Sequence, residues 1–279
     1  MSDKTIRYVM HDKLCTYSYR TGYVTGPVLG NHMHIYYEFI NIIEGNALYN
    51  VEGQEYEISA GDIVFTNPNE FHFISFPKGT LYSRQFLQID SRLVNGIKAN
   101  ILDVLNARTF GQNNKIPADI VSKYNLLDIF KGVEEYSVKK NDDTDLMLSL
   151  YCAQLIIKVS EILQKEFLVN DTSAKHKHIK AIYDYIEKNF TKPIKVDDIA
   201  NAVYLNKSYI SRLFKSKTAL TLSAYINIRR IMLAKNLLLG GKNATDIFFD
   251  CGFNDYSTFY RSFKAYVGTS PEDFKKNNL

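Results

Sequence analysis

The sequence predicts an α+β multidomain protein, with an N-terminal antiparallel β jelly-roll barrel and a C-terminal all-α part. The chain has 279 residues, which suits two domains of ordinary size. Apolar residues alternate with polar ones in short runs up to residue 90 and recur at helical spacing after it. Residues 171–279 carry 18 lysines and arginines against 10 aspartates and glutamates, a net charge of +8. Residues 1–170 carry 16 against 20, a net charge of −4, so the two parts are expected to face different partners.

The composition excludes several classes of protein. With 46% hydrophobic and 23% charged residues, the chain is neither collagen-like nor wholly disordered. Its longest apolar stretch, residues 146–159, is shorter than the roughly 20 residues of a membrane span. Residues 1–13 lack the apolar core of a signal peptide, so we expect a cytoplasmic protein without a membrane segment. Cys15, Cys152 and Cys251 are odd in number and far apart in sequence and include no CxxC pair, which argues against a disulfide framework or a cysteine zinc site.

Seven short strands are expected in the barrel, which we assign to residues 1–90. Turn-forming residues separate the apolar runs, for example at residues 44–46 and 67–69. Because no helical pattern lies between the runs, they predict an antiparallel sandwich or barrel. The expected strands are 23–29, 34–43, 47–51, 55–58, 62–66, 71–76 and 81–89.

Residues 91–169 are predicted to form a helical segment for dimerisation and coupling. Apolar residues recur every three or four positions over residues 93–105 and 120–133. A third helix, residues 143–168, is apolar nearly all round at its centre, which exceeds the needs of one buried face. Such a helix packs either on the barrel and a second subunit or fully inside a monomer, and the sequence leaves both open. Residues 170–178 are polar and aperiodic and are interpreted as a linker.

An internal repeat occupies residues 179–279. Each copy combines a short helix, a tight break and a second amphipathic helix, at 196–203 and 207–215 and again at 245–251 and 256–264. This order is typical of the helix-turn-helix, whose second helix enters the major groove of DNA. The matched residues, at offsets of 48 and then 49, are Asp198, Ile199, Arg212, Phe214 and Lys215 in the first copy and Asp246, Ile247, Arg261, Phe263 and Lys264 in the second.

A continuous helix over residues 222–239 connects the two copies. Eighteen helical residues span about 27 Å. That length suits two recognition helices about one turn of B-DNA apart, near 34 Å.

Each second helix carries an arginine at the same repeat position, Arg212 or Arg261. A guanidinium suits bidentate contacts with guanine O6 and N7. One such arginine alone would be interpreted as an ordinary surface charge, whereas its repetition favours contact with double-stranded DNA. The expected DNA-facing residues are Lys207, Ser208, Ser211, Arg212 and Lys215 in the first copy and Tyr256, Ser257, Tyr260, Arg261 and Lys264 in the second.

The basic part resembles the AraC/XylS family of bacterial transcription regulators from residue 179 to about residue 276. The similarity is strongest at residues 252–264 (GFNDYSTFYRSFK) and 268–274 (GTSPEDF). It implies a sequence-specific regulator with two helix-turn-helix units, expected to be an activator and a homodimer, and it leaves a contact with RNA polymerase open. Two positions depart from the family pattern, Ala219 in place of a usual glycine and Phe248 in place of a small alanine.

The N-terminal part resembles the cupin superfamily through a pair of motifs. The first is formed by Gly26, His32, His34, Glu38 and Gly45, and the weaker second by Gly61, Pro68, Glu70 and His72. In the second motif Glu70 replaces a glycine, His72 arrives one residue early and the expected asparagine is missing. The resemblance implies a cupin-like barrel that senses an effector.

The histidines and the carboxylate of these motifs suit a polar pocket. On one strand His32, His34 and Glu38 would share a face. With His72 they offer three imidazoles and one carboxylate, a set that suits zinc, iron, manganese or nickel. The alternative is a set of partly buried hydrogen-bonding residues without a metal. We expect no catalytic residue, no cofactor and no obligatory metal, and assign an effector pocket to His32, His34, Tyr36, Glu38 and His72.

The barrel is rich in aromatic residues, which favours a carbohydrate as the small-molecule effector, because sugar C–H faces stack on rings. Aromatic residues of a small barrel are also ordinary core residues. Two other functions stay open: a metal-dependent cupin enzyme with a basic helical appendage, and a regulator whose barrel only dimerises. The aromatic residues of the barrel include Tyr23, Tyr36, Tyr37, Tyr49, Tyr56, Phe65 and Phe73.

Overall fold

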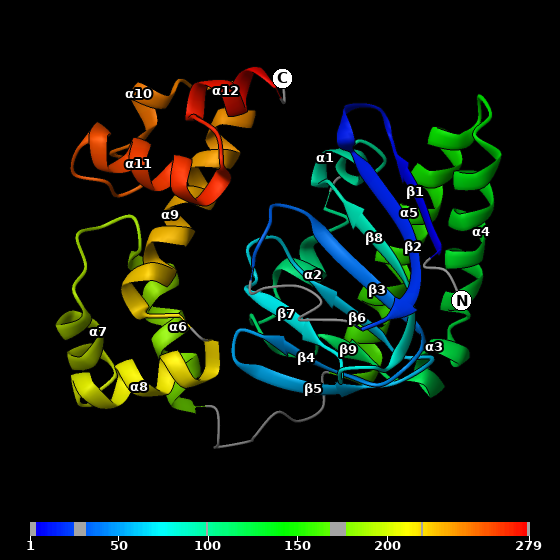
Figure 1. Ribbon diagram of the computed structural model, residues 1–279, viewed down its shortest axis with the longest axis horizontal. Coiled ribbons are helices and arrows are strands. Elements are labelled where there is room, and N and C mark those ends of the chain that lie inside the picture. Colours follow the sequence, from blue (N-terminus) through cyan, green and yellow to red (C-terminus); the bar gives the residue numbers. More distant parts are fainter. Residues whose placement is uncertain (1–3, 25–31, 99, 168–176, 219, 278–279) are drawn as a thin grey trace. The chain divides into compact units, whose positions relative to one another are not determined.

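The computed structural model describes residues 4–24, 32–98, 100–167, 177–218 and 220–277. The chain divides into two compact units, Met1–Asp171 and Thr172–Leu279. The strands belong to the first unit, and the second is helical (Figure 1). This confirms the predicted α+β class.

Two antiparallel sheets form the N-terminal unit. The larger has the strand order β1-β2-β8-β3-β6-β9 and the smaller the order β5-β4-β7. A 3-10 helix, His11–Lys13, lies between the first two strands. The strands are β1 (Lys4–Val9), β2 (Cys15–Tyr23), β3 (Tyr37–Glu44), β4 (Ala47–Val51), β5 (Gln54–Ile58), β6 (Ile63–Thr66), β7 (His72–Ser75), β8 (Leu81–Ile89) and β9 (Lys115–Ile116).

Most of the predicted strands are present, and two, β4 and β8, have the predicted bounds. β3 begins at Tyr37 rather than at residue 34, because His32 forms a β-bridge with His72 of the smaller sheet before the chain enters the larger one. β1, most of β2 and β9 were not predicted, since the first two mix polar and apolar residues and the last has two residues. The strand expected at residues 23–29 lies mostly outside the described residues.

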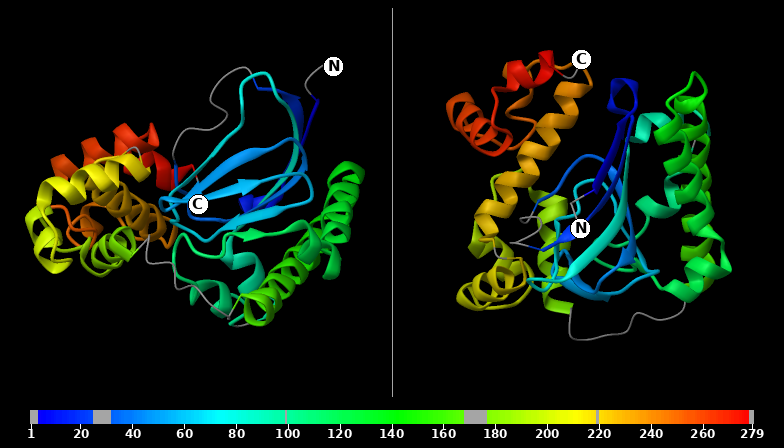
Figure 2. Two further views of the ribbon diagram at one scale, coloured as in Figure 1. Left: turned by 90° about the horizontal axis from the view of Figure 1, so that it is seen from below. Right: turned by 45° about the vertical axis from the view of Figure 1, so that its right-hand side comes forward.

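Helices cover one face of the larger sheet, as the green helices in Figure 2 show. They are α1 (Ser91–Asn95), α2 (Asp103–Asn106), α3 (Ala118–Lys123), α4 (Leu126–Lys139) and α5 (Thr144–Glu166). α5 confirms the helix predicted at residues 143–168. The helices predicted at 93–105 and 120–133 are each divided in two, the second at Asn125, whose φ of 53° is left-handed and interrupts the helix.

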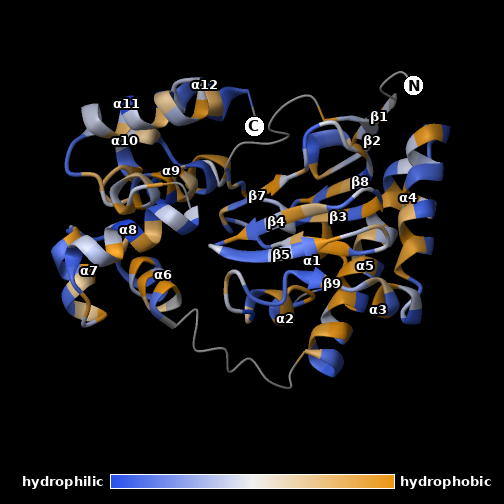
Figure 3. Cartoon of the chain, turned by 60° about the horizontal axis from the view of Figure 1, so that its bottom comes forward, coloured by the Kyte–Doolittle hydropathy of each residue, from blue (hydrophilic) through white to orange (hydrophobic). Residues whose placement is uncertain are grey.

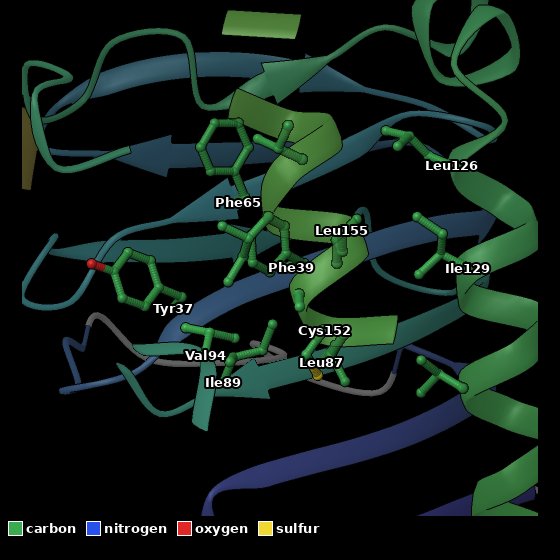
Figure 4. Packing of buried hydrophobic residues seen from close by; sticks show 14 of the residues in the cluster. Tyr37, Phe39, Phe65, Leu87, Ile89, Val94, Leu126, Ile129, Cys152 and Leu155 are labelled. Carbon is green, nitrogen blue, oxygen red and sulfur yellow. The ribbon is translucent and has the colours of Figure 1, made fainter. Parts of the chain in front are cut away.

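Side-chain alternation along the strands creates two separate cores in this unit. Phe39 and Leu87 face the helices, where they pack with Cys152 and Leu155 of α5 (Figure 4). On the opposite face of the larger sheet, the sandwich interior is enclosed by the smaller sheet. Its apolar members include Val24, Ile40, Ile42, Tyr49, Val51, Val64, Ile74 and Tyr82.

α5 is more apolar than one buried face requires, as Figure 3 shows by colour. By length and composition alone this helix is long and apolar enough to cross a membrane, but half of its most apolar window is buried inside the unit. Leu146, Leu150 and Ile157 form an exposed stripe, with 60%, 48% and 49% of their surface accessible. The helix is therefore not fully buried within the described monomer.

The described part of the C-terminal unit consists of helices and short connections. The central helix α9 (Leu222–Leu239) has the predicted bounds and contacts α8 of the first copy and α10, α11 and α12 of the second. The other helices are α6 (Lys177–Asn189), α7 (Val196–Ala202), α8 (Lys207–Thr218), α10 (Ala244–Ile247), α11 (Tyr256–Val267) and α12 (Pro271–Lys276). α10 is shorter than the expected 245–251, since the chain continues as turns toward Gly252.

Candidate DNA-binding helices and candidate effector site

The first helix-turn-helix unit comprises α7 and α8. Phe214 of α8 is fully buried and packs against Tyr183 and Tyr225, with both pairs of ring centroids 5.2 Å apart. Asn206 caps α8, because its Oδ1 accepts a hydrogen bond from Ser208 N at 2.8 Å. The buried ring and the cap together fix which side of α8 faces solvent.

The predicted DNA-facing residues of α8 lie on its outer side. Lys207, Ser208, Arg212 and Lys215 are exposed, and Ser211 is half-buried. Lys207 Nζ also forms an ion pair with a carboxylate of α7, Asp197, at 2.7 Å.

The second unit comprises α10 and α11 and is anchored by a row of phenylalanines. Ring centroids of Phe259 lie 5.3 Å from Phe253 and 5.8 Å from Phe263, which in turn lies 5.7 Å from Phe274. Asp255 caps α11 by accepting a hydrogen bond from Thr258 N at 2.8 Å.

The turn before α11 requires a glycine. Gly252 has a φ of +89°, a left-handed conformation that other residues rarely adopt. A Cβ there would lie 2.8 Å from the carbonyl oxygen of Thr191 and 2.9 Å from that of Phe190. Phe248, the departure from the family pattern, lies edge-on against Tyr256, with centroids 5.9 Å apart, while Ala219 lies outside the described residues.

The predicted residues of α11 differ in how freely they face solvent. Ser257, Arg261 and Lys264 are exposed. Tyr256 and Tyr260 are half-buried with ring centroids 6.2 Å apart, and the Tyr256 hydroxyl donates to Glu272. Burial and the Glu272 carboxylate raise the pKa of Tyr256 to about 12.

Not every arginine of the C-terminal unit is available to bind a partner. Arg229 is buried and pairs with Glu187 of α6. Arg230 donates from Nε to Phe190 O at 2.7 Å and from Nη2 to Lys192 O at 2.8 Å. These two side chains hold α9 against the end of α6, whereas Arg212 and Arg261 remain exposed.

In the N-terminal unit, the structure brings His32, His34, Glu38 and His72 together. Their ligand atoms all lie within 4.8 Å of one another. Backbone hydrogen bonds of 3.1 and 2.9 Å between His32 and His72 hold these two residues side by side. Glu38 comes from β3 of the larger sheet and His72 from β7 of the smaller one, so the cluster joins both sheets.

Glu38 lies at the centre of this cluster and is 1% exposed. Its Oε2 is 2.7 Å from His34 Nε2, and its Oε1 is 3.5 Å from His72 Nε2. Burial raises the pKa of Glu38, but the two imidazoles outweigh it and hold that pKa well below its usual range. Burial lowers the pKa of His72, and the Glu38 carboxylate reverses the direction to a net increase.

The other predicted pocket residues contribute less than expected. The Tyr36 ring lies beside His34, with centroids 6.2 Å apart, but its carbonyl makes the contact with the imidazole. Tyr37 and Phe65 belong to the core under the helices, and Tyr23 is 53% exposed. Of the seven aromatic residues named from the sequence, Tyr49 is fully buried in the sandwich interior, and Tyr56 is partly buried against the same core.

Glu70, in the second motif, has a structural role. Its carboxylate pairs with Arg108 and accepts hydrogen bonds from Asn67 N at 2.7 Å and Gly111 N at 2.8 Å. Its carbonyl accepts from His72 Nδ1 at 2.8 Å. This network positions His72 and adds no ligand atom to the cluster.

Arg84 of β8 was not among the residues predicted from the sequence. It lies opposite Ile42 in the strand register and therefore faces the sandwich interior. The residue is 6% exposed, and its Nε and Nη1 have no hydrogen-bond partner among the described residues; nor has the Tyr49 hydroxyl. Burial lowers the pKa of Arg84. Arg84 lies on the same face of β8 as Tyr82 and Phe86, because side chains of a strand alternate between its two faces. This alternation is the signal from which its inward position could have been predicted.

An open pocket of about 700 Å³ also lies on the N-terminal unit. It runs along β4, β5 and β7 and contains none of the predicted effector residues. Its lining residues are Asn46, Ala47, Leu48, Glu57, Ile58, Ser59, Ser75, Phe76, Pro77 and Lys115.

Comparisons with known proteins match both units. Residues 18–149 match the AraC-like ligand-binding domain, and residues 199–277 match a helix-turn-helix domain. The HTH-type transcriptional activator RhaS of Escherichia coli O1:K1 is 22% identical over 246 residues, covering 88% of this chain and 87% of RhaS. RhaS of E. coli strain UTI89 gives the same values.

Solved structures of ToxT from Vibrio cholerae are also similar. ToxT of strain O395 bound to (E)-4-(8-methylnaphthalen-1-yl)but-3-enoic acid is 16% identical, with full coverage of both chains and a TM-score of 0.41. Unsaturated fatty acid-bound ToxT of strain SCE256 is 18% identical, covering 99% of this chain and 95% of ToxT, with a TM-score of 0.41.

A β-sandwich that encloses several buried polar side chains, followed by a repeated helix-turn-helix, is the arrangement of a DNA-binding transcription regulator with a ligand-binding domain. The N-terminal and the C-terminal parts of the chain match the two domains of such a regulator, in the order predicted from the sequence. The chain belongs to the AraC/XylS family.

Proposed function

We propose that this regulator is a sequence-specific activator that contacts successive major-groove segments through α8 and α11. The observation that carries the proposal is the exposure of Arg212 and Arg261 at one position of a repeated, firmly anchored helix. The net charge of +8 on residues 171–279 supports attraction to phosphates. The proposed contact residues are Lys207, Ser208, Ser211, Arg212 and Lys215 with Tyr256, Ser257, Tyr260, Arg261 and Lys264.

The test compares the full chain on a duplex from its own upstream region with a shuffled duplex of equal length and composition. At an ionic strength of about 0.15 M, specific binding is expected to be at least about 100-fold tighter. Equal affinity for both duplexes would remove sequence specificity from the proposal.

We further propose that a small-molecule effector binds in the sandwich interior. Support comes from Arg84 and Tyr49, because buried polar atoms without partners cost free energy unless a ligand satisfies them. A hydroxyl-rich molecule matches this interior, so a carbohydrate stays the favoured class, and the guanidinium favours an acidic sugar. The effector shifts the protein between DNA-bound states only by binding one state more tightly.

A thermal-shift screen of the full chain tests the effector, because a ligand of the native state raises its stability. Neutral sugars, sugar acids and fatty acids are compared at equal concentration. A sugar acid should raise Tm in the parent and not in Arg84→Met. No shift from any sugar, or an undiminished shift in Arg84→Met, would contradict this effector site.

The exposed stripe on α5 supports a homodimer. Leu146, Leu150 and Ile157 offer an apolar surface that a second copy of the helix would cover. Sedimentation should show a dimer that dissociates in Leu150→Lys, with Lys165→Ala, at an ion pair on the same helix, as the control. A monomeric parent would contradict the proposal.

The remaining proposals concern the cellular setting. We place the regulator in the cytoplasm, where it would meet DNA and, as an activator, RNA polymerase. No enzymatic activity is proposed, since the family consists of transcription regulators.

A further inference from the structure

Three arginines lie on one face of the larger sheet, across β1, β2 and β8. Arg20 lies directly opposite Arg84 in the strand register. Arg7 lies directly opposite Ser18, which is two residues before Arg20. Directly paired residues share a face, and so do residues two apart on one strand. Because Arg7 and Arg20 are exposed and Arg84 is 6% exposed, this arginine row extends from solvent into the sandwich interior.

The arginine row has little negative charge beside it. None of the residues that β1, β2 and β8 place on this face is an aspartate or a glutamate. The buried carboxylate of β3, Glu38, is already shared by two imidazoles, at 2.7 Å from His34 Nε2 and 3.5 Å from His72 Nε2. Like charges directly opposite each other on neighbouring strands are destabilising. The pair formed by Arg20 and Arg84 therefore costs stability in the absence of an anion.

The surroundings of Arg84 agree with this geometry. Burial lowers the pKa of Arg84, the Glu38 carboxylate opposes the decrease, and the positive charge of Arg20 adds to it. Arg84 Nε and Nη1 are buried and have no hydrogen-bond partner in the described part of the chain. The guanidinium carbon lies 6.0 Å from the centroid of the Phe86 ring, which packs beside it. The side chain is thus held in the interior with hydrogen-bond donors to which the protein supplies no acceptor.

A phosphate monoester matches these donors better than a carboxylate does. A carboxylate has two oxygens and one negative charge, which Arg84 alone would neutralise. A phosphate monoester carries a charge of about −1.5 to −2 at pH 7 and three acceptor oxygens. Guanidinium groups match the geometry of phosphate oxygens and bind them through strong, charge-assisted hydrogen bonds. Two guanidiniums that face each other therefore indicate a ligand group with two negative charges.

We propose that the effector carries a phosphate group, which Arg84 and Arg20 bind together. Arg84 contacts the phosphate from the interior and Arg20 from the exposed side. Arg7, at the outer end of the row, adds to the positive potential that attracts the anion. The ligand is then a phosphorylated sugar, the doubly charged form of an acidic sugar, and this inference rests on the effector site of the proposed function.

Binding of inorganic phosphate to the DNA-free full chain tests the anion site. Equilibrium dialysis with labelled phosphate is carried out near neutral pH, with the ionic strength held constant by sodium chloride. The parent should bind one phosphate per chain more than an Arg20→Met/Arg84→Met double variant does. Affinity should fall at least about 10-fold in each single variant. Equal phosphate binding by the parent and the double variant would overturn the proposal.

Controls separate the site from general effects of charge and of folding. Lys131→Met removes an exposed positive charge from α4 and should bind phosphate as the parent does. Circular dichroism shows which variants fold. Arg20→Met changes an exposed side chain, so it decides the outcome if Arg84→Met does not fold. Phosphate affinity unchanged in a folded Arg20→Met would contradict the paired arginines.

A thermal-shift comparison distinguishes this inference from the effector site on which it rests. Hexose and pentose phosphates are compared with the free sugars and the corresponding sugar acids, at equal concentration and ionic strength. A sugar phosphate should raise Tm more than its sugar acid does, and the increase should require both Arg20 and Arg84. A sugar acid that raises Tm at least as much, through Arg84 but not Arg20, would overturn the phosphate and retain the effector site. No increase with any of these ligands, together with no phosphate binding, would contradict both.

Discussion

The two units of this regulator place the polar groups of their candidate sites in opposite ways. The N-terminal unit encloses Arg84, Glu38 and His72 between two sheets. The C-terminal unit displays Arg212 and Arg261 on the solvent side of helices that bury Phe214 and Phe263 on their inner side.

Because of this difference, each candidate site is identified by a different feature of the molecule. A buried polar atom without a partner costs free energy, so a side chain with several such atoms, as Arg84 has, requires an explanation, of which a bound ligand is one. An exposed arginine carries no such constraint, because water satisfies it. In the C-terminal unit the indication comes from repetition of the same residue in two copies of one structural unit.

The largest expected effect concerns the anchoring of α11. Phe263→Ala removes a fully buried ring from the phenylalanine row and should destabilise the second helix-turn-helix by about 3–5 kcal/mol. Hydrogen exchange should rise over residues 256–267 more than over 207–218. Phe214→Ala should produce the reverse pattern. Uniform change in both segments would mean that the two copies do not fold as separable units.

The second prediction contrasts two buried arginines of the N-terminal unit. Arg108→Met leaves Glu70 without its guanidinium and should cost about 3 kcal/mol of unfolding free energy. Arg84→Met removes a guanidinium with unsatisfied nitrogens and should leave the ligand-free protein equally or more stable. The two variants are compared by urea unfolding of the full chain, followed through the spectroscopic signal of the β-strands. A greater loss in Arg84→Met would contradict the assignment of Arg84 to ligand binding.

A smaller effect is expected for DNA recognition. Arg212→Ala and Arg261→Ala should each weaken binding to the cognate duplex by about 1–3 kcal/mol and relax base preference at one segment. Lys165→Ala in the N-terminal unit serves as the charge control. An equal loss on cognate and shuffled duplexes would instead assign the arginine to phosphate contact.

The smallest expected effect is a loss of folding stability at alkaline pH. Burial, followed by a hydrogen bond to Asp145, raises the pKa of Tyr8 to about 12, and burial raises that of Tyr37 to about 12. Because the folded-state pKa of each tyrosine is raised, its contribution to the free energy of unfolding is fully present below the unfolded pKa of 10. This contribution is lost as pH rises from 10 toward 12. The urea midpoint of unfolding, followed through the signal of the β-strands, should fall between pH 10 and pH 12. It should fall less in Tyr37→Phe than in the parent chain. Equal slopes in both proteins would contradict the contribution of Tyr37.

Much of the C-terminal unit could be predicted because its signals are local. α9 has the predicted bounds, and Asn206 and Asp255 cap their helices through their own side chains. Among the helices predicted there, α10 is shorter than expected, since Phe248 begins a series of turns that periodicity does not distinguish from helix.

The N-terminal site could be predicted only in part, because it depends on contacts between distant strands. Motif spacing identified His32, His34, Glu38 and His72, but the expected single strand is replaced by a bridge between sheets. Arg84 needs the register of β8 against β3 to be placed. The partner of Glu70, Arg108, lies 38 residues further along the chain, where no local pattern marks it.

The most direct test of DNA recognition by both copies is protection of guanine N7 from methylation on the cognate duplex. Two protected segments about one helical turn apart are expected, with the first lost in Arg212→Ala and the second in Arg261→Ala. Retention of both segments in both variants would contradict base reading by these arginines.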